Sequence, residues 1–471
     1  MDRKSGVLMH VSSLFGDYSI GSFGNEALEF IDYISAAGFH AWQILPLCVT
    51  DEFNSPYKSP SSFSMNPYFL DLPTLYKKGL ISRFELESAK GTGRYLCEYE
   101  RLKRERISLL FHASQRAKSD LDLRLKMDSF FSSHPMIESA ARFLAKKENG
   151  GILTEEWEFA WQFIQFELFS QWSEIKKHAA KNDVQIIGDI PMFVSLESAE
   201  VSEFPSEFLL DGAGRAAFVA GAPPDSFSPF GQCWGNPLYD YEKMAENGFS
   251  LWRSRIKYAA EVFDIIRIDH FRGFEAFWSI PAKSSDAREG RWVKAAGAKV
   301  IDAIKSELSD FPVIAEDLGE ITTEVQKLLS YSGFMGTRVL QFALSGEKSS
   351  PHLPHNYSAN DAAYTATHDN NTTLAYVMEL PIDTRVTLFE YCGYKGTDAA
   401  DGVKHIIDTV LRSNAALAIF PIQDLLGFGA DTRMNTPGTA VGNWAYRITR
   451  EQLYSLNQGE LWRKNNLFGR V

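Results

Sequence analysis

The sequence predicts an α/β protein built as a (β/α)8 barrel, and two observations indicate this fold. Short apolar runs bounded by polar residues recur eight times, at 6–11, 41–47, 184–190, 264–269, 311–317, 337–342, 362–367 and 417–422. Continuous apolar runs are typical of strands buried on both faces of a parallel sheet. Helical patterns lie between most of the runs, and eight strands alternating with helices favour a closed TIM barrel.

Composition sets limits on domain number and on partners. The 471 residues are 45% hydrophobic and 23% charged, as in ordinary globular proteins. No linker-like or repetitive tract divides the chain, so we expect 1–471 to form a single catalytic barrel. The net charge of −12 argues against a nucleic-acid binder.

The sequence also bears on location. No apolar run reaches the ~20 residues that span a bilayer, and the start of the chain lacks the pattern of a signal peptide. The four cysteines, at 48, 97, 233 and 392, form no disulfide framework. We therefore expect a cytoplasmic protein with no membrane partner.

Two stretches break the even spacing of the barrel. The second and third runs lie far apart, and the charged, helical pattern between them predicts a mostly helical insertion over 73–180. Its last helix carries an apolar stripe with spacings of three and four, at 157, 161, 164, 168, 172 and 175. After the third run, 195–260 lacks a clear period, which predicts a loop-rich insertion.

Acidic residues end several of the predicted strands: Asp189, Asp269, Glu316, Asp317 and Asp369. The carboxyl ends of barrel strands meet at one rim, where barrel enzymes place their chemistry. Any one of these acids could be only a helix N-cap. Several together point instead to metal binding or to glycoside chemistry, which needs paired carboxylates.

Arg267 favours the glycoside chemistry. Side chains alternate along a strand, so Arg267 and Asp269 face the same side. A guanidinium there should repel a divalent cation, lower the pKa of Asp269 and keep that carboxylate ionised. The first run also lacks a His-x-His pair, because His10 is followed by Val11 and Ser12. We expect no metal, and no organic cofactor either, since no glycine-rich phosphate loop follows a strand.

Three sequence motifs contain the acids named above: RIDHFRG (267–273), AEDLG (315–319) and THDN (367–370). They resemble the catalytic blocks of the 4-α-glucanotransferases, also called amylomaltases or disproportionating enzymes, which form glycoside hydrolase family 77 in the α-amylase clan. Further similar blocks occur in family order over nearly the whole chain, at 5–14, 54–67, 188–194, 231–241, 351–357 and 421–447.

The resemblance implies catalytic roles. Asp269 would be the nucleophile that forms a glucosyl-enzyme intermediate, and Arg267 would orient it. Glu316 would be the general acid and base, with its pKa raised by the neighbouring acids. Asp369 would hold ring hydroxyls and stabilise the transition state.

The resemblance also implies substrate contacts: His368, Asp189, Tyr57, Ser55, Trp234, Asn236 and Phe227. Three of these positions have alternatives. Tyr57 could simply pack on the adjacent proline instead of contacting the sugar. Trp234 and Asn236 could form a rigid scaffold rather than touch the acceptor. Phe227 could form a hydrophobic lip over the acceptor site, whereas His270 and Arg272 are expected to support the site from behind.

The chain departs from the family pattern at a few positions. Asn371 stands where the family usually has an acid, Val11 stands in a proline position, and the loop before 231 reads SFSPF rather than the common form. None of these departures touches the three carboxylates. They bear on loop details and acceptor preference.

The expected activity is retaining transfer between α-1,4-glucans. The donor would be an α-1,4-glucan or malto-oligosaccharide, and the acceptor another glucan or glucose. An α-glucan hydrolase shares the same carboxylates and is the first alternative. A catalytically silent glucan-binding barrel is the second.

Overall fold

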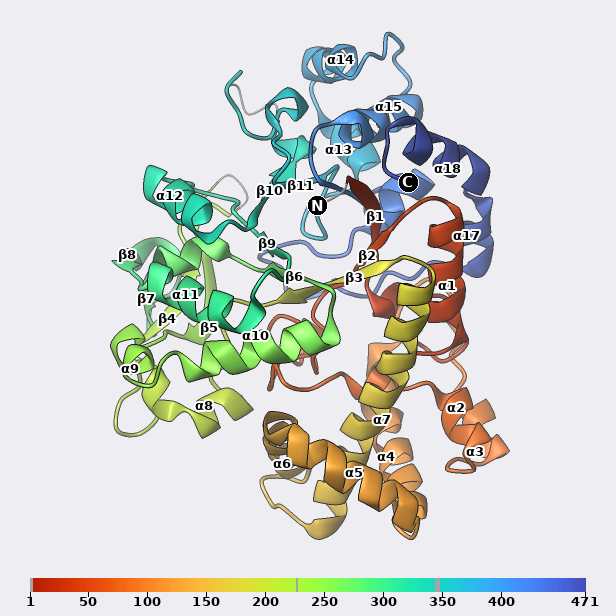
Figure 1. The fold of residues 1–471 in the computed structure, drawn as a ribbon, viewed down its shortest axis with the longest axis vertical. Coiled ribbons are helices and arrows are strands. Elements are labelled where there is room, and N and C mark those ends of the chain that lie inside the picture. The colour runs from red at the N-terminus through yellow and green to blue at the C-terminus, as the bar shows by residue number, and fades with distance from the viewer. Residues whose placement is uncertain (1–2, 226–227, 344–347) are drawn as a thin grey trace.

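The computed structural model describes residues 3–225, 228–343 and 348–471. Within these ranges, eight parallel strands close into a barrel in the order β1-β12-β11-β10-β9-β6-β3-β2 (Figure 1). The barrel strands are β1 (Lys4–Leu8), β2 (Ala41–Gln43), β3 (Gln185–Ile190), β6 (Ile265–Ile268), β9 (Val313–Ala315), β10 (Met335–Val339), β11 (Asp361–Tyr364) and β12 (Leu417–Pro421). Each overlaps one of the predicted apolar runs, so the predicted (β/α)8 barrel is confirmed.

Pairing between the first and last strands closes the barrel, with Lys4 opposite Leu417 and Leu8 opposite Pro421. Strand residues are almost entirely buried, as expected for a sheet covered by helices on the outside. Gly188 in β3 allows a close approach, because a Cβ atom there would lie 2.1 Å from the ring of Phe263. Small residues at such points let the outer layer pack directly on the strands.

Helices surround the barrel (Figure 1). The N-terminal half contributes α1 (Asn25–Ala36) and α7 (Glu155–Lys181), and the middle contributes α10 (Ser250–Val262), α11 (Gly297–Leu308) and α12 (Thr323–Ser332). The C-terminal part adds α13 (Thr373–Glu379), α14 (Ile382–Tyr391), α15 (Ala399–Arg412), α16 (Ile422–Leu426), α17 (Arg450–Ser455) and α18 (Gln458–Leu467).

Helix α7 carries the predicted apolar stripe. Five of the six stripe residues are buried, and Trp157 near the start of the helix is half-buried. The indole Nε1 of Trp172 donates a hydrogen bond of 2.8 Å to the carbonyl of Val262. The stripe therefore fixes α7 against the barrel, and Thr154 caps the first turn of the helix.

Between β2 and β3 the chain leaves the barrel and forms the helical projection at the lower end of Figure 1. It contains α2 (Leu72–Lys77), α3 (Arg83–Ser88), α4 (Tyr99–Ala117), α5 (Leu121–Ser133) and α6 (Pro135–Glu148). Helices α4, α5 and α6 pack on α7, which returns the chain to β3.

The chain between β3 and β6 is more regular than its sequence predicts. It holds α8 (Ala199–Glu203), β4 (Phe218–Ala222), β5 (Gln232–Pro237), α9 (Tyr241–Glu246) and then α10. Among the described residues, β4 and β5 join β7 (Ala276–Pro281) and β8 (Arg291–Lys294) in an antiparallel sheet of order β5-β4-β7-β8. Strand β4 (FVAGA) contains a glycine, and β5 (QCWGNP) contains a glycine and a proline and is partly exposed, so neither shows the alternation of apolar and polar residues that would reveal it.

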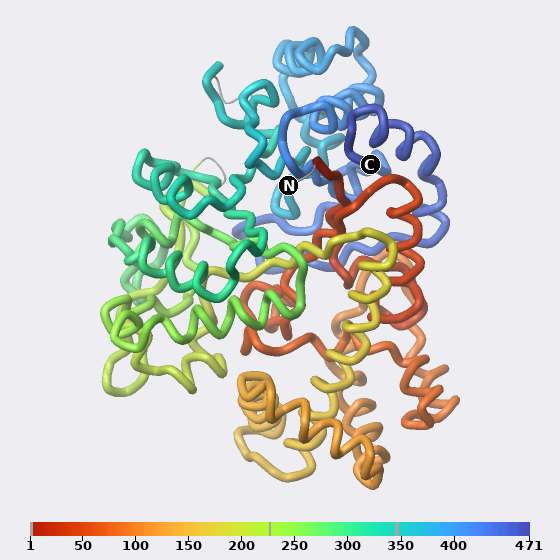
Figure 2. Tube along the Cα trace, in the orientation of Figure 1, coloured from red at the N-terminus to blue at the C-terminus, as the bar shows by residue number. Residues whose placement is uncertain are grey.

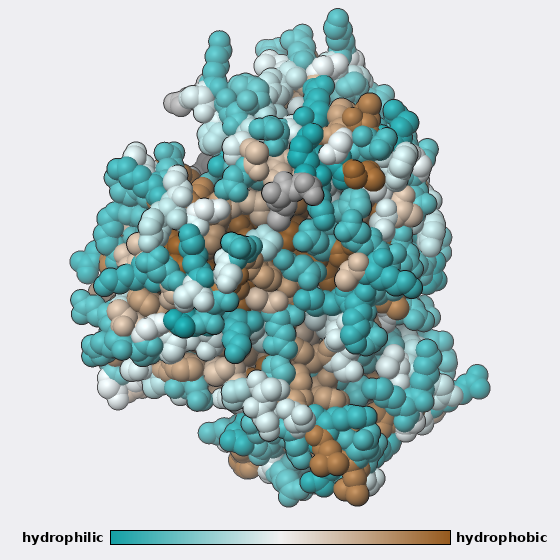
Figure 3. All heavy atoms as spheres, viewed as in Figure 1, coloured by the Kyte–Doolittle hydropathy of each residue, from teal (hydrophilic) through white to brown (hydrophobic). Residues whose placement is uncertain are grey.

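The two ends of the described chain lie near each other (Figure 2). The guanidinium of Arg470 donates a hydrogen bond of 2.8 Å to the carbonyl of Lys4. Polar side chains cover most of the face in Figure 3, and hydrophobic ones lie between them in small groups. Across the described ranges, we find no helix with the length and apolar character needed to cross a membrane.

Candidate active site

The site is built around the guanidinium of Arg267, at the end of β6. In the sheet register Arg267 lies opposite Asp189 of β3, and its Nη1 contacts the Oδ2 atom of that residue. The same Nη1 lies 3.1 Å from Oδ1 of Asp269, and Nη2 lies 4.0 Å from Oε2 of Glu316. The side chain of Arg267 is only 5% exposed. One buried cation therefore holds the acids of three adjacent strand ends.

The backbone fixes the two expected catalytic acids. Asp269 follows the last residue of β6, and Glu316 follows the last residue of β9. His270 has a φ of 48°, in the left-handed region, and its amide N–H donates a hydrogen bond of 2.5 Å to Oε2 of Glu316. The carboxyl of Glu316, the candidate general acid, is thus held by His270, the residue that follows Asp269, the candidate nucleophile.

Burial changes the proton affinity of both acids. It raises the pKa of Asp269 to about 7, with the charges of Asp189 and Asp369 adding and that of Arg267 opposing. Burial and the charge of Asp269 raise the pKa of Glu316 to about 8. The expected direction for Glu316 is confirmed. Arg267 lowers the pKa of Asp269 as expected, but loss of solvent outweighs this effect, so the pKa is raised and the expectation that Arg267 alone keeps the group ionised was wrong.

The raised pKa of Glu316 lets it keep a proton to higher pH than an ordinary glutamic acid does, as a general acid must. Arg267, in contact with Asp269, favours the ionised form of that carboxyl, as a nucleophile requires.

Tyr57 links the Arg267 cluster to the next part of the site. Its Oη donates a hydrogen bond of 2.7 Å to Oδ2 of Asp189 and lies 2.9 Å from Nε2 of His368. Since the only hydroxyl proton of Tyr57 goes to Asp189, Nε2 of His368 carries the proton of the second bond. Burial lowers the pKa of His368, so the ring is neutral. The two rings stack at 5.3 Å with 9° between their planes.

Asp369 completes the set of three expected carboxylates. Its Oδ1 lies 3.4 Å from Nε2 of His368, and its side chain is 44% exposed. The network therefore runs without a break from Asp369 through His368, Tyr57 and Asp189 to Arg267. The structure brings together the three carboxylates, Arg267 and three of the expected substrate contacts, Asp189, Tyr57 and His368.

The other expected contacts lie in different settings. Trp234 on β5 packs edge-on against His270, with 4.9 Å between ring centroids. The side-chain amide of Asn236 donates to the carbonyl of Val194 at 2.8 Å. Ser55 belongs to the turn that carries Tyr57, and its Oγ accepts a bond of 3.3 Å from the amide of that residue. Phe227 lies outside the described residues.

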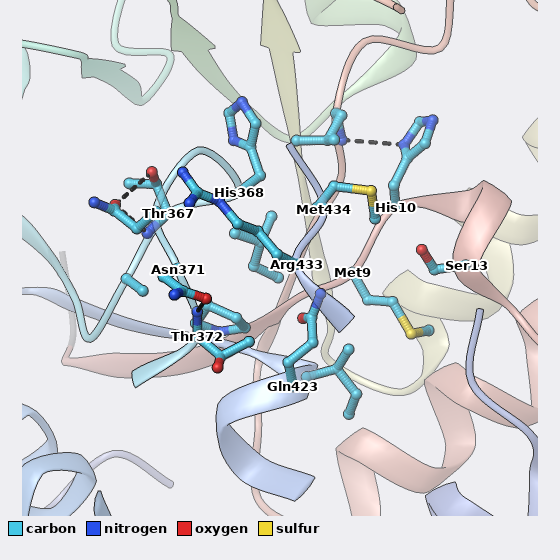
Figure 4. Close-up of a pocket in the computed structure, with 16 residues that line it drawn as sticks. Met9, His10, Ser13, Thr367, His368, Asn371, Thr372, Gln423, Arg433 and Met434 are labelled. Carbon is cyan, nitrogen blue, oxygen red and sulfur yellow. Dashed lines mark hydrogen bonds between the residues drawn. The ribbon is translucent and has the colours of Figure 1, made fainter. Parts of the chain in front are cut away.

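A cavity lies beside His368, at the ends of β1, β11 and β12 (Figure 4). Residues that line it include Met9, His10, Ser13, Gln423 and Met434. Burial lowers the pKa of His10 to about 3, so this ring is neutral, and its Nδ1 accepts a bond from the amide of Leu45 at 3.2 Å. His10 therefore adds no charge to the cavity beside His368.

Two residues of the site were not singled out from the sequence. Asn435 donates a hydrogen bond of 2.6 Å from Nδ2 to Oδ1 of Asp369, and Arg433 donates one of 2.5 Å to the carbonyl oxygen of Asp369. Both belong to the block at 421–447 that resembles the family, and this was the signal that could have found them.

Comparisons with known proteins agree on one family. The family model of glycoside hydrolase family 77, described as 4-alpha-glucanotransferase, matches residues 9–160 and 153–453. A 4-alpha-glucanotransferase of Streptococcus pneumoniae is 38% identical over 477 residues, covering 96% of this chain and 94% of its own. One of Thermus thermophilus is 38% identical over 487 residues, covering 96% of each.

Solved structures agree as well. The amylomaltase of Streptococcus agalactiae, determined in complex with acarbose, superposes with a TM-score of 0.95 at 32% identity and covers 100% of both chains. An amylomaltase of Corynebacterium glutamicum shares the fold, with a TM-score of 0.84 at 19% identity over 100% of this chain and 75% of its own.

Proposed function

The chain belongs to the 4-α-glucanotransferases of glycoside hydrolase family 77, and from this premise we propose which of its residues carry out the transfer. The protein is an enzyme that transfers segments of an α-glucan. Asp269 is the nucleophile, Glu316 the general acid and base, and Asp369 the third carboxylate.

In the first step Asp269 attacks the anomeric carbon of the donor. The bond from that carbon to the glycosidic oxygen breaks, and Glu316 gives its proton to the departing oxygen. The products are a glucosyl ester of Asp269, a free glucan end and an ionised Glu316. The raised pKa of Glu316 supports its role as the acid, because the group keeps a proton that it can donate.

In the second step the 4-hydroxyl of an acceptor attacks the same carbon. Glu316 removes the hydroxyl proton, the ester bond to Asp269 breaks, and the new α-1,4 bond has the original configuration. Two inversions explain the retention. We propose malto-oligosaccharides and glucose as acceptors.

Substrate hydroxyls would be held on the side of Asp189 and His368. Oδ1 of Asp189 is buried without a hydrogen-bond partner among the described residues. Buried acceptors of this kind are costly unless they are paired. A hydroxyl of the sugar bound next to Asp269 would satisfy this atom and would align the ring for attack.

The single observation that supports these roles most strongly is the pair Asp269 and Glu316 on one buried guanidinium, with the pKa of Glu316 raised by burial and by the charge of Asp269. Incubation with maltotriose and separation of the products tests the transfer. We expect glucose together with maltopentaose and longer chains. Only glucose and maltose, without longer chains, would favour the hydrolase instead.

The expected location is also a proposal. We propose that the enzyme works in the cytoplasm, where its four cysteines would remain as thiols. Fractionation of the cells followed by an activity assay tests this, and activity found mainly outside the cytoplasmic fraction would contradict it.

A further inference from the structure

Residues 433–435, which we call the clip, follow β12 and α16 in the chain and are hydrogen-bonded to the loop that carries His368 and Asp369. The clip is far from this loop in the sequence, since Asn435 lies 66 positions after Asp369. Arg433 extends from the clip toward Thr367 and His368 (Figure 4). Figure 4 also places Met434 beside the cavity behind His368.

Four hydrogen bonds hold the clip to the loop and to itself. The guanidinium of Arg433 donates to the carbonyl of Asp369 at 2.5 Å and to the carbonyl of Asn435 at 2.7 Å. The backbone amide of Asn435 donates to the carbonyl of His368 at 3.1 Å. The side chain of Asn435 then reaches Oδ1 of Asp369 at 2.6 Å.

Asp369 needs such support more than the other two catalytic acids. Its side chain is 44% exposed, compared with 28% for Asp269 and 15% for Glu316. Its contact with His368 is long, at 3.4 Å, so the bond from Asn435 is the shorter of these two restraints. An exposed carboxylate with one short restraint is free to change rotamer when that restraint is lost.

We propose that Arg433 is a positioning residue for the transfer, which holds Asn435 and the backbone of Asp369 so that the carboxylate of Asp369 faces the sugar bound at Asp269. This proposal rests on the role assigned to Asp369 above. Arg433 acts through main-chain carbonyls, so this role does not require it to touch the substrate.

The charge of Asp369 gives the proposal a distinctive signature. This charge raises the pKa of both Asp269 and Glu316. The other groups that face the pair are Arg267, Asp189, Tyr57, His368 and His270, and none of them contacts Arg433 in the bonds described above. If the carboxylate of Asp369 turns toward solvent, its charge should raise the two pKa values less. Both limbs of the profile of kcat against pH, which report the ionisation of Asp269 and Glu316, should then move to lower pH.

The test uses Arg433→Met and Arg433→Lys in the full chain, with maltotriose as substrate. We expect Arg433→Met to lower kcat by about 10- to 100-fold, as small misplacements of catalytic groups do. KM should change by less than about threefold, since binding contacts remain. Lysine can reach only one of the two carbonyls, so Arg433→Lys should lose less.

Arg412→Met is the matched control. Arg412 likewise donates to a main-chain carbonyl, that of Cys392 at 3.2 Å, but it lies at the end of α15. We expect Arg412→Met to keep the kcat and the pH limbs of the parent enzyme. A kcat of Arg433→Met equal to that of the parent would overturn the proposal. So would a loss of kcat with unmoved pH limbs, which would indicate only less folded enzyme.

A second pair of variants separates this proposal from the role of Asp369. If Asp369→Asn keeps parental activity, the role of Asp369 fails. If Asp369→Asn is inactive while Arg433→Met is normal, only the positioning role fails. If both roles hold, Asp369→Asn loses most of its activity, and Arg433→Met should reduce the residual rate of Asp369→Asn by a much smaller factor than it reduces the rate of the parent, because the group that it positions is already lost.

Discussion

The proposed active site has two sides that are built in different ways, which we call the barrel wall (Asp189, Arg267, Asp269 and Glu316) and the sheet wall (Trp234 on β5). The barrel wall presents charged groups from strand ends, with Asp189 and Arg267 nearly inaccessible to solvent. The sheet wall comes from β5, a strand of the small antiparallel sheet, and presents the half-buried indole of Trp234. Gly235 beside it has a φ of 76°, which turns the chain at this point.

The difference suggests a division of labour. Charges are placed where the backbone is most rigid, since preorganised groups stabilise a transition state without rearrangement. The sheet wall offers an uncharged surface, and aromatic faces suit flat apolar sugar faces. We therefore expect changes in the barrel wall to abolish the chemistry, and changes in the sheet wall to alter which acceptor is used.

The largest effect should come from Asp269→Asn. The amide cannot form the glucosyl ester, so we expect transfer and hydrolysis to fall together by about 10⁴-fold or more. Initial rates with maltotriose measure both. If one activity were lost and the other survived, Asp269 could not be the nucleophile for both, because transfer and hydrolysis depend on the same intermediate.

The smaller variant Asp269→Gly sharpens this test. Azide can occupy the space of the lost carboxylate and attack the anomeric carbon from the same side. We expect β-glucosyl azides as products when azide and a glucosyl fluoride donor are supplied together. If an α-azide forms instead, a different group is acting as the nucleophile.

Glu316→Gln should have the next largest effect. Without a proton to donate, we expect the rate with maltotriose to fall by about 10²- to 10⁴-fold. A maltotriosyl fluoride donor needs little acid assistance, so the first step with this donor should lose much less. Equal losses with both donors would mean that Glu316 is not the general acid.

The sequence predicts the barrel wall far better than the sheet wall. Strands β6 and β9 are apolar runs that end directly in Asp269 and Glu316, so both the elements and the acids at their ends can be read locally. Strand β5 reads QCWGNP, whose glycine and proline signal a turn. Its strand conformation depends on pairing with β4, a contact that the local pattern does not encode.

Three features of the site depend on the folded structure alone. The left-handed conformation of His270 has no local signal, because only a few per cent of non-glycine residues adopt it, even though histidine is among the more frequent ones. The contact of Asn435 with Asp369 joins distant parts of the chain. The raised pKa of Asp269 follows from burial, whereas the pairing with Arg267 that the sequence predicts acts in the opposite direction.

Trp234→Ala tests the sheet wall. Loss of the indole should lower kcat/KM for transfer by about 2- to 10-fold, the usual scale of one aromatic contact. We expect the share of hydrolysis to rise, because water replaces a weakly bound acceptor. Trp234→Phe is the matched control and should keep most of the transfer. An unchanged ratio of transfer to hydrolysis in Trp234→Ala would remove the sheet wall from acceptor selection.

The smallest expected effect concerns stability. The pKa of Glu316 is about 8 in the folded protein, well above its value in an unfolded chain. The folded state therefore binds more protons, and the stability contributed by this group is present at low pH and lost as pH rises through about 8. At high pH the ionised carboxylate of Glu316 is buried in the barrel wall, and this buried charge lowers the stability of the folded protein.

Glu316→Gln should remove this cost. We expect its Tm to exceed that of the parent enzyme by about 1–3 °C at pH 9, and by less at pH 5, where Glu316 is protonated. Trp234→Phe changes no charge, so its Tm difference from the parent should be the same at both pH values. Calorimetry of the three proteins at pH 5 and 9 measures this. A pH-independent difference for Glu316→Gln would mean that the carboxyl is already ionised at pH 5, and Glu316 could not then supply the proton for the first step.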